Sequence, residues 1–192
     1  MNVALSVTMA QTEISGLSGP VTGYFLTTIL LILFGINLFG DKLDLFYLGD
    51  CTFIYAVLGV LILVVAGLCL KNWYLMSGYL FLLIAIETIC MSIGSTIWSY
   101  EFGDAVNIVM FIAIMMIALM CYRMEEDIQM TINILLGVML ILSMSVFDDM
   151  SVILSIISIV CGCLTAYMCY STWSMIQDMG AEYEGKLPIK KG

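Results

Sequence analysis

Long apolar runs separated by short polar breaks dominate the chain. The clearest run extends from Trp73 to Trp98, with an indole at each end and one ionisable side chain, Glu87, near its centre. A segment this long with so few charges is typical of a transmembrane helix, and tryptophan collects at the two lipid–water boundaries. Runs of this kind predict six transmembrane helices, at about 22–40, 52–70, 73–97, 105–122, 129–147 and 151–172.

The breaks between the runs indicate how the helices follow one another. Residues 71–72 separate the second and third runs, and residues 148–150 separate the fifth and sixth. Connections this short force neighbouring helices into antiparallel hairpins. Before the first run, Gly16, Gly19 and Pro20 are expected to break any earlier helix.

The basic residues predict the orientation of the chain. Five of the six fall at one end of the predicted bundle, and only Lys42 falls at the other. The five are Lys71, Arg123, Lys186, Lys190 and Lys191. Because cytoplasmic loops carry an excess of Lys and Arg, both the N and C termini are predicted to be cytoplasmic.

Composition narrows the class of protein. The chain has 192 residues, of which 62% are hydrophobic and 11% charged. Soluble domains are about 45–50% apolar, so residues 1–192 are expected to form a single all-α integral membrane domain in a lipid bilayer. Nothing is basic enough for nucleic acid. The chain has no His and no clustered carboxylates in its apolar runs, so neither a metal nor another cofactor is expected.

Glu87 is the main candidate for chemistry. An ionised carboxylate at mid-membrane costs roughly 2.5–3.5 kcal/mol, so Glu87 should face protein or water. Desolvation within the membrane also favours its protonated form. The functional interpretation is a site that handles a proton or a solute, and the structural alternative is a protonated Glu that joins two helices. No predicted helix carries Lys or Arg away from its ends, so an anion would have to cross protonated or be held by N–H and hydroxyl groups.

Few other polar residues lie inside the runs. Thr27 and Thr28 fall in the first, and Asn133 falls in the fifth. They could offer hydrogen bonds to a solute. Small and hydroxyl-bearing residues at helical spacing also mark helix–helix contacts, and threonine hydroxyls often bond to their own backbone.

Several short motifs resemble one family of membrane proteins. They are GYFLTTILL at residues 23–31, AGL at 66–68, CGCLTAY at 161–167 and YEGKLPI at 183–189. In this order and spacing they are similar to motifs of the acetate uptake transporter family, which includes bacterial succinate–acetate permeases. The chain departs from that family before its first helix, where the sequence NPAPLGL is missing, and in its third helix, where residues 80–84 are wholly apolar. It therefore resembles a divergent member.

The resemblance implies a six-helix protomer with its own solute path, assembled as a homo-hexamer. A ring of apolar and aromatic side chains would narrow the path, and its members would be Tyr24, Leu135 and either Tyr79 or Leu82. Hydrophobic constrictions of this kind gate by steric blocking and dewetting. Thr27, Thr28 and Asn133 would offer hydrogen bonds, and Glu87 would take up or release the proton.

The expected function is transport of small monocarboxylates such as acetate across the cell membrane, by proton coupling or as a channel. One alternative is a channel for a neutral solute (urea, a short amide or ammonia) with a similar hexameric plan. Another is a membrane scaffold protein that transports nothing. An enzyme is not expected, because the chain lacks a Ser/His/Asp or Cys/His set and Glu87 has no second carboxylate beside it.

Overall fold

The computed structural model describes residues 2–42, 51–97 and 100–186, with side chains at 19–41, 51–92, 103–147 and 150–178. All regular structure in these ranges is helical. The elements are α1 (Asn2–Lys42), α2 (Thr52–Lys71), α3 (Leu75–Ile97), α4 (Tyr100–Arg123), α5 (Asp127–Leu142), the 3₁₀ helix η1 (Ser145–Met150) and α6 (Ser151–Lys186). Trp98 and the basic pair Lys190 and Lys191 lie outside the described residues.

Within the described ranges, five helices are long and apolar enough to cross a membrane: α1, α2, α3, α4 and α6. Long apolar helices thus make the chain a multi-pass membrane protein. The sequence predicted a fifth span over 129–147, but α5 has 16 residues. At 1.5 Å per residue it is about 24 Å long, whereas the hydrocarbon core of a bilayer is about 30 Å thick.

The α5 helix stops early because polar groups hold the chain that follows it. Ser143 Oγ donates to the carbonyl oxygen of Leu140 at 2.8 Å and accepts a bond from Asn107 Nδ2 at 3.1 Å. Ser145 donates from its backbone N–H, at 3.0 Å, and from its hydroxyl, at 2.5 Å, to the carboxylate of Asp104 on α4. These bonds fix η1 as the corner that leads into α6.

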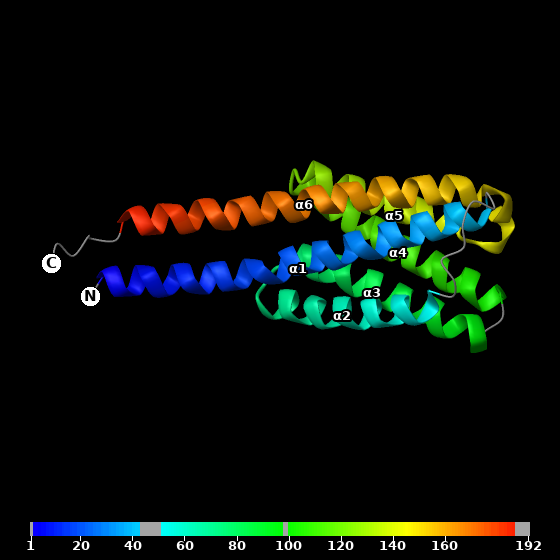
Figure 1. The fold of residues 1–192 in the computed structure, drawn as a ribbon, viewed down its shortest axis with the longest axis horizontal. Helices are drawn as coiled ribbons and strands as arrows, with labels where there is room; N and C mark the ends of the chain where they lie inside the picture. Colours follow the sequence, from blue (N-terminus) through cyan, green and yellow to red (C-terminus); the bar gives the residue numbers. More distant parts are fainter. Residues whose placement is uncertain (1, 43–50, 98–99, 187–192) are drawn as a thin grey trace.

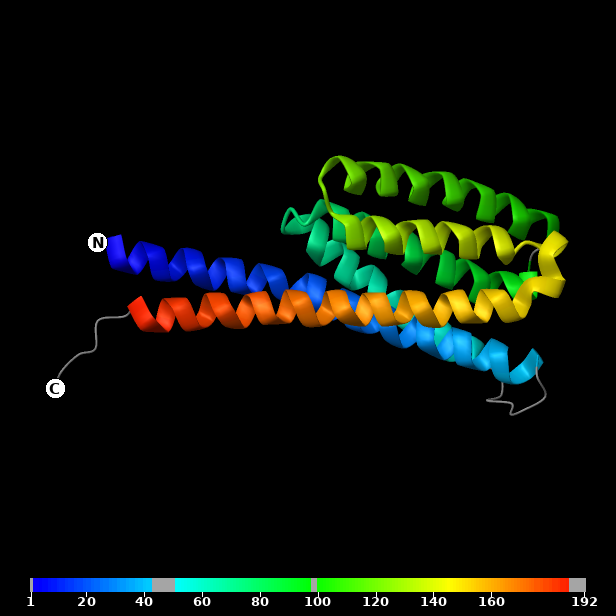
Figure 2. The same cartoon turned by 90° about the horizontal axis from the view of Figure 1, so that it is seen from above.

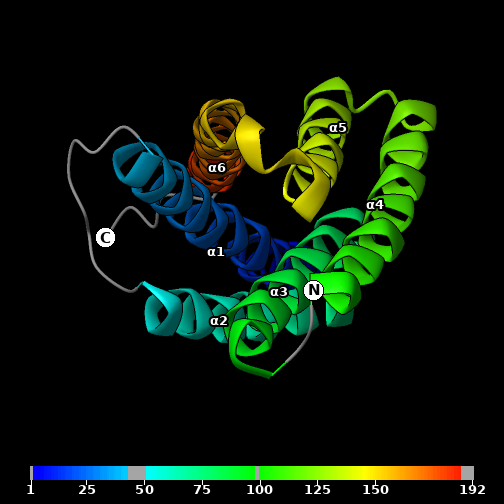
Figure 3. The same ribbon diagram turned by 90° about the vertical axis from the view of Figure 1, so that its right-hand side faces the viewer.

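The helices form a ring. Each contacts the next along the chain, and α6 closes the ring by packing along α1. Seen from its end, the bundle shows α2, α3, α4 and α5 arranged around one side and α1 with α6 on the other (Figure 3). The first and last helices are antiparallel neighbours over a long distance (Figure 1).

The α1 and α6 helices project together beyond the other four at the end where the termini lie (Figure 2). The expectation that Gly16, Gly19 and Pro20 break the chain here was wrong, because α1 runs through Pro20. A proline removes one backbone hydrogen bond, and helices in membranes tolerate this loss.

The α1–α6 contact is built from small side chains. Ser155 Oγ donates to the carbonyl oxygen of Gly35 at 2.6 Å, and Ser158 Oγ donates to that of Leu31 at 2.7 Å. A Cβ atom on Gly35 would lie 3.0 Å from the carbonyl oxygen of Ser155, so the two backbones approach closely. Small residues allow such approach between helices in membranes, where side-chain hydrogen bonds add to the contact.

Two hairpins use the same cap at the end where the termini lie. After α2, the N–H groups of Tyr74 and Trp73 bond to the carbonyls of Cys69 and Leu70, and after α4 the N–H groups of Glu126 and Glu125 bond to those of Cys121 and Tyr122. Both sets of bonds form Schellman motifs, which place the residue after the cap in the left-handed region. That residue is Trp73 (φ 66°) in the first hairpin and Glu125 (φ 60°) in the second. Trp73 is 83% exposed, as expected for an indole at a membrane boundary.

Candidate solute cavity

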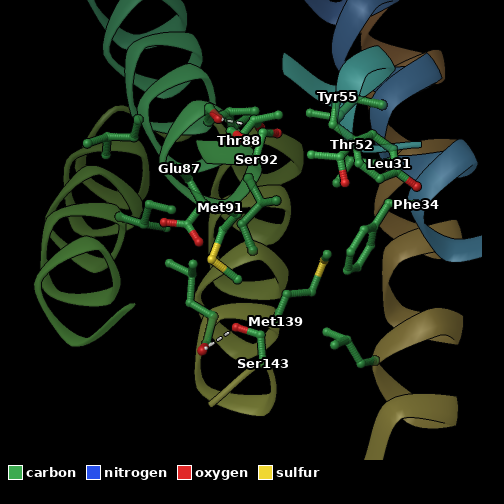
Figure 4. A pocket seen from close by; sticks show the side chains of 17 residues that line it. Leu31, Phe34, Thr52, Tyr55, Glu87, Thr88, Met91, Ser92, Met139 and Ser143 are labelled. Carbon is green, nitrogen blue, oxygen red and sulfur yellow. Dashed lines mark hydrogen bonds between the residues drawn. The ribbon is translucent and has the colours of Figure 1, made fainter. Parts of the chain in front are cut away.

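A cavity of about 230 Å³ lies inside the ring, and all six α-helices contribute to its wall. Figure 4 shows its 17 lining side chains. They come from the end of the bundle opposite the termini, where α1, α3 and α5 end and α2 and α6 begin. The lining residues are Leu30, Leu31, Phe34, Thr52, Tyr55, Leu83, Ile84, Glu87, Thr88, Met91, Ser92, Ile114, Leu136, Met139, Leu140, Ser143 and Leu154.

Glu87 is the only carboxylate among the lining residues. The buried side chains of Leu80, Phe81, Ile84 and Ala85 fix the rotation of α3, which brings Glu87 to the cavity. Its Oε2 atom is buried and receives no hydrogen bond from any described residue. Glu87 lies on one side of the cavity in Figure 4. Glu87 thus lines the cavity and keeps one carboxyl oxygen without a partner among the described residues.

The hydroxyls beside Glu87 are mostly engaged with their own helices. Thr88 Oγ1 donates to the carbonyl oxygen of Ile84 at 2.7 Å, and Ser92 Oγ donates to that of Thr88 at 2.7 Å. Ser143 does the same on α5. The protons of these three hydroxyls are therefore in use, and Ser143 Oγ also accepts the bond from Asn107 Nδ2. Thr88, Ser92 and Ser143 thus offer few hydrogen-bond donors to a solute.

Packed aliphatic side chains close the cavity toward the termini. Leu31, Ile84, Ile114 and Leu136 line it and are each less than 7% exposed. We call these four residues the apolar plug. About two turns before Leu31 on α1 and one turn before Ile84 on α3, the rings of Tyr24 and Phe81 meet edge to face, with centroids 5.0 Å apart. Buried apolar and aromatic side chains therefore lie between the cavity and the end of the bundle that holds the termini.

Polar side chains return beyond the apolar plug. On α5, Asn133 and Gln129 precede Leu136 at helical spacing, and on α1 Thr27 precedes Leu31. All three polar residues are buried, and Thr27 Oγ1, Asn133 Oδ1 and Gln129 Nε2 bond to no described residue. Asn133 Nδ2 donates to the carbonyl oxygen of Gln129 at 2.7 Å. The centre of the ring thus changes from polar to apolar and back to polar along its length.

The structure brings only Glu87 of the sequence-predicted residues to the cavity; the other seven lie elsewhere. Tyr24 is buried and shares a 3.2 Å hydrogen bond with Ser77, and Thr28 Oγ1 bonds to Thr165 Oγ1 at 3.0 Å across the α1–α6 contact. Thr27 and Asn133 lie beyond the apolar plug. Leu82 and Leu135 are partly buried against the core, while Tyr79 is 45% exposed. Their role in a solute path stays a prediction.

Sequence reasoning missed the aromatic wall of the cavity. Phe34 on α1 and Tyr55 on α2 form an edge-to-face pair with centroids 6.2 Å apart, and they lie across the cavity from Glu87 (Figure 4). Met91, one turn after Glu87, could be found from helical spacing. No sequence signal linked Phe34 and Tyr55, because they come from different helices.

Among the residues whose side chains are described, no group of three or more His, Cys, Asp or Glu could hold a metal ion. What the cavity offers to a solute is one carboxyl group, a few hydrogen-bond acceptors and an apolar wall that is partly aromatic. Comparison of the chain with family models, with curated proteins and with solved structures finds no match. The fold and the cavity define a multi-pass helical membrane protein with an internal solute-sized site.

Proposed function

We propose that this chain is a cell-membrane transporter that moves a small solute through the centre of its helical ring, with Glu87 taking up and releasing a proton. The observation that carries the proposal is the cavity inside the ring with Glu87 in its wall. Carboxyl groups within membrane spans are costly and rare, and where they face the bundle interior or a cavity they mark solute or proton paths. In a non-transporting scaffold we would expect Glu87 to be satisfied across helices, whereas its Oε2 has no partner among the described residues. Asn133 does reach a neighbouring helix, because its Nδ2 donates to Cys121 Sγ on α4 at 3.7 Å, so Glu87 alone carries this distinction.

The proposed topology has six spans with both termini in the cytoplasm. In this arrangement α5 and η1 together make the fifth span, and the cavity faces the extracellular side. Lys71 and Arg123 support the orientation, because they lie in the last turns of α2 and α4, and cytoplasmic loops carry an excess of Lys and Arg. The resemblance to acetate uptake transporters further suggests a homo-hexamer in which each protomer has its own path.

Small monocarboxylates such as acetate are the first proposed substrates. The lining residues include no Lys or Arg, so a carboxylate anion finds no counter-charge there and Glu87 would repel it. A monocarboxylate would therefore pass as the neutral acid, with Glu87 protonated. The neutral polar residues beyond the apolar plug, Thr27, Asn133 and Gln129, also suit urea or a short amide, which makes a neutral-solute channel the second candidate.

The apolar plug would be the gate in this mechanism. In the state described here, Leu31, Ile84, Ile114 and Leu136 lie between the cavity and the buried polar residues nearer the termini. Hydrophobic constrictions block flow by excluding water. Widening the plug would connect Glu87 to Asn133 and Gln129 and complete the route.

The test is uptake of labelled acetate by proteoliposomes at pH 5–6, with a pH indicator inside the vesicles. We expect acetate flux above that of empty vesicles, accompanied by protons. Glu87→Gln keeps the shape of the side chain and mimics the neutral acid, so the pH dependence of its flux should reduce to that of the protonated fraction of acetate itself. Glu125→Gln is the matched control, because Glu125 lies exposed in the α4–α5 turn. Absence of flux in the wild type would refute the monocarboxylate proposal, and an unchanged pH profile in Glu87→Gln would refute the role of Glu87.

A further inference from the structure

We propose that the cavity also binds small hydrophobic monocations, such as protonated amines or quaternary ammonium ions, in exchange for the proton on Glu87. The proposal uses the same cavity as transport but does not depend on acetate being a substrate. It follows from the charge of the lining residues, from the aromatic wall and from the size of the space.

The charge argument concerns what can neutralise Glu87. Among the lining residues, α1, α4, α5 and α6 contribute no ionisable side chain, and α2 contributes only the phenol of Tyr55. On α3 itself, the thiol of Cys90 is the nearest other titratable group along the helix. Phenols and thiols are ordinarily neutral near pH 7. An ionised Glu87 therefore needs a cation from solution, and the alternative is a bound proton.

The type of cation follows from the other ligands. A hard ion such as Ca²⁺ takes six to eight oxygen ligands, and the cavity supplies a single carboxylate. An organic monocation needs only one counter-charge and gains from apolar contact. The thioethers of Met91 and Met139 offer adaptable contact of this kind.

The aromatic wall strengthens the case. Phe34 and Tyr55 lie opposite Glu87 in Figure 4, with their ring centroids 6.2 Å apart. Aromatic faces attract ammonium groups within about 6 Å of the ring centroid, and more strongly when water is excluded. An ion between the two sides would meet a carboxylate on one side and two aromatic rings on the other. The cavity, at about 230 Å³, is smaller than the roughly 300–1,000 Å³ typical of drug-sized ligands, so the ion must be small.

Binding is an exchange in which no covalent bond to carbon changes. The protonated Glu87 carboxyl releases its proton to water, and the resulting carboxylate receives the organic cation. One proton therefore leaves for each cation bound whenever Glu87 starts protonated. Cation affinity should rise with pH over that range and level off once the carboxyl is ionised.

The experiment is calorimetric titration of the purified full-length protein in detergent with benzyltrimethylammonium. Titrations in two buffers of different ionisation enthalpy count the protons released. We expect saturable binding with up to one proton released per ion, and binding that tightens as pH rises. Glu87→Gln should weaken binding at least tenfold and end proton release, while Glu125→Gln should change neither. Phe34→Leu keeps an apolar side chain but removes a π-face, so it should weaken binding by about 2- to 30-fold.

The other possible results also decide whether the cavity binds cations. No saturable binding by wild type overturns the proposal, and so does binding that releases no proton and persists in Glu87→Gln, because that is partition into the micelle. If Glu87→Gln fails to fold, the proton count of the wild type and the Phe34→Leu variant still decide. Cation binding without acetate flux would support this inference and refute the monocarboxylate substrate. Acetate flux without cation binding would do the reverse.

Discussion

Gly23 gives the sharpest test of how tightly the closed half of the ring is packed. It lies on α1 against the ring of Phe81 on α3. A methyl carbon built on Gly23 falls 2.5 Å from Cζ and 2.6 Å from Cδ2 of that ring. Phe81 is fully buried and holds Tyr24 edge to face, so the ring has no free space behind it. Gly23→Ala should therefore push α1 and α3 apart.

The size of the effect can be worked from these contacts. Cε2 of the ring lies closer still, and carbon atoms attract best at about 3.5–4.0 Å, so the ring or the helix must move by roughly 1.5 Å. Overpacking a well-packed core costs about 1–3 kcal/mol. Replacing Gly by Ala in a helix returns about 1 kcal/mol through propensity, so the net loss is about 0–2 kcal/mol. Gly67→Ala on α2 is the matched control, because no atom of the described residues lies within 4 Å of its built Cβ. It should keep the full gain of about 1 kcal/mol, which puts the two variants about 1–3 kcal/mol apart.

The assay is reversible unfolding in mixed micelles, with increasing SDS and tryptophan fluorescence as the signal. Wild type, Gly23→Ala and Gly67→Ala are compared in one detergent at one pH. We expect the midpoint of Gly23→Ala to fall below that of Gly67→Ala. If Gly23→Ala were as stable as Gly67→Ala, the close packing of α1 against α3 at Gly23 and Phe81 would be refuted.

Three further variants test separate features. Glu125→Gly should stabilise the protein by up to about 1 kcal/mol, because glycine adopts the left-handed conformation without strain, and a lower unfolding midpoint would contradict the α4–α5 cap. Ser158→Ala removes the hydrogen bond to the carbonyl of Leu31. In the same unfolding assay it should lower the free energy of unfolding by about 0.6 kcal/mol and by at most about 1.7 kcal/mol. A larger loss of stability would mean that the hydroxyl does more than join α1 and α6. Ile84→Ser places a hydroxyl in the apolar plug and should raise basal solute leak through proteoliposomes, since hydration opens a hydrophobic gate; unchanged leak would place the barrier elsewhere.

Much of the fold could be predicted from the sequence because lipid makes helices obligatory. The predicted helices at 52–70, 73–97 and 105–122 lie close to α2, α3 and α4. The ends of the other helices depend on contacts that no local pattern shows. Partners from α4 hold the corner after α5, and α6 supports α1 along its length.

The site was harder to predict, because helix rotation is set by packing. Glu87 stands out in any reading of the chain as a lone acid in an apolar run. Tyr79 looked equally suitable for a constriction, yet its neighbours Gly78 and Leu80 are both buried. Leu70 of α2 packs so closely on Gly78 that a Cβ there would meet its side chain at 2.7 Å, and this contact turns Tyr79 outward. Phe34 and Tyr55 meet only because α1 and α2 are neighbours in the ring.

The side-by-side course of α1 and α6 means that the order of the helices around the ring has no natural starting point. A short linker could join the end of α6 to the beginning of α1, and the chain could be opened instead in the turn between α4 and α5, where Met124–Glu126 form an exposed cap. Such a circular permutant would keep every contact between neighbouring helices while changing which helix is synthesised first. Its folding and insertion, compared with those of the wild type, would separate the helix contacts that stabilise the ring from the helix order that membrane insertion requires.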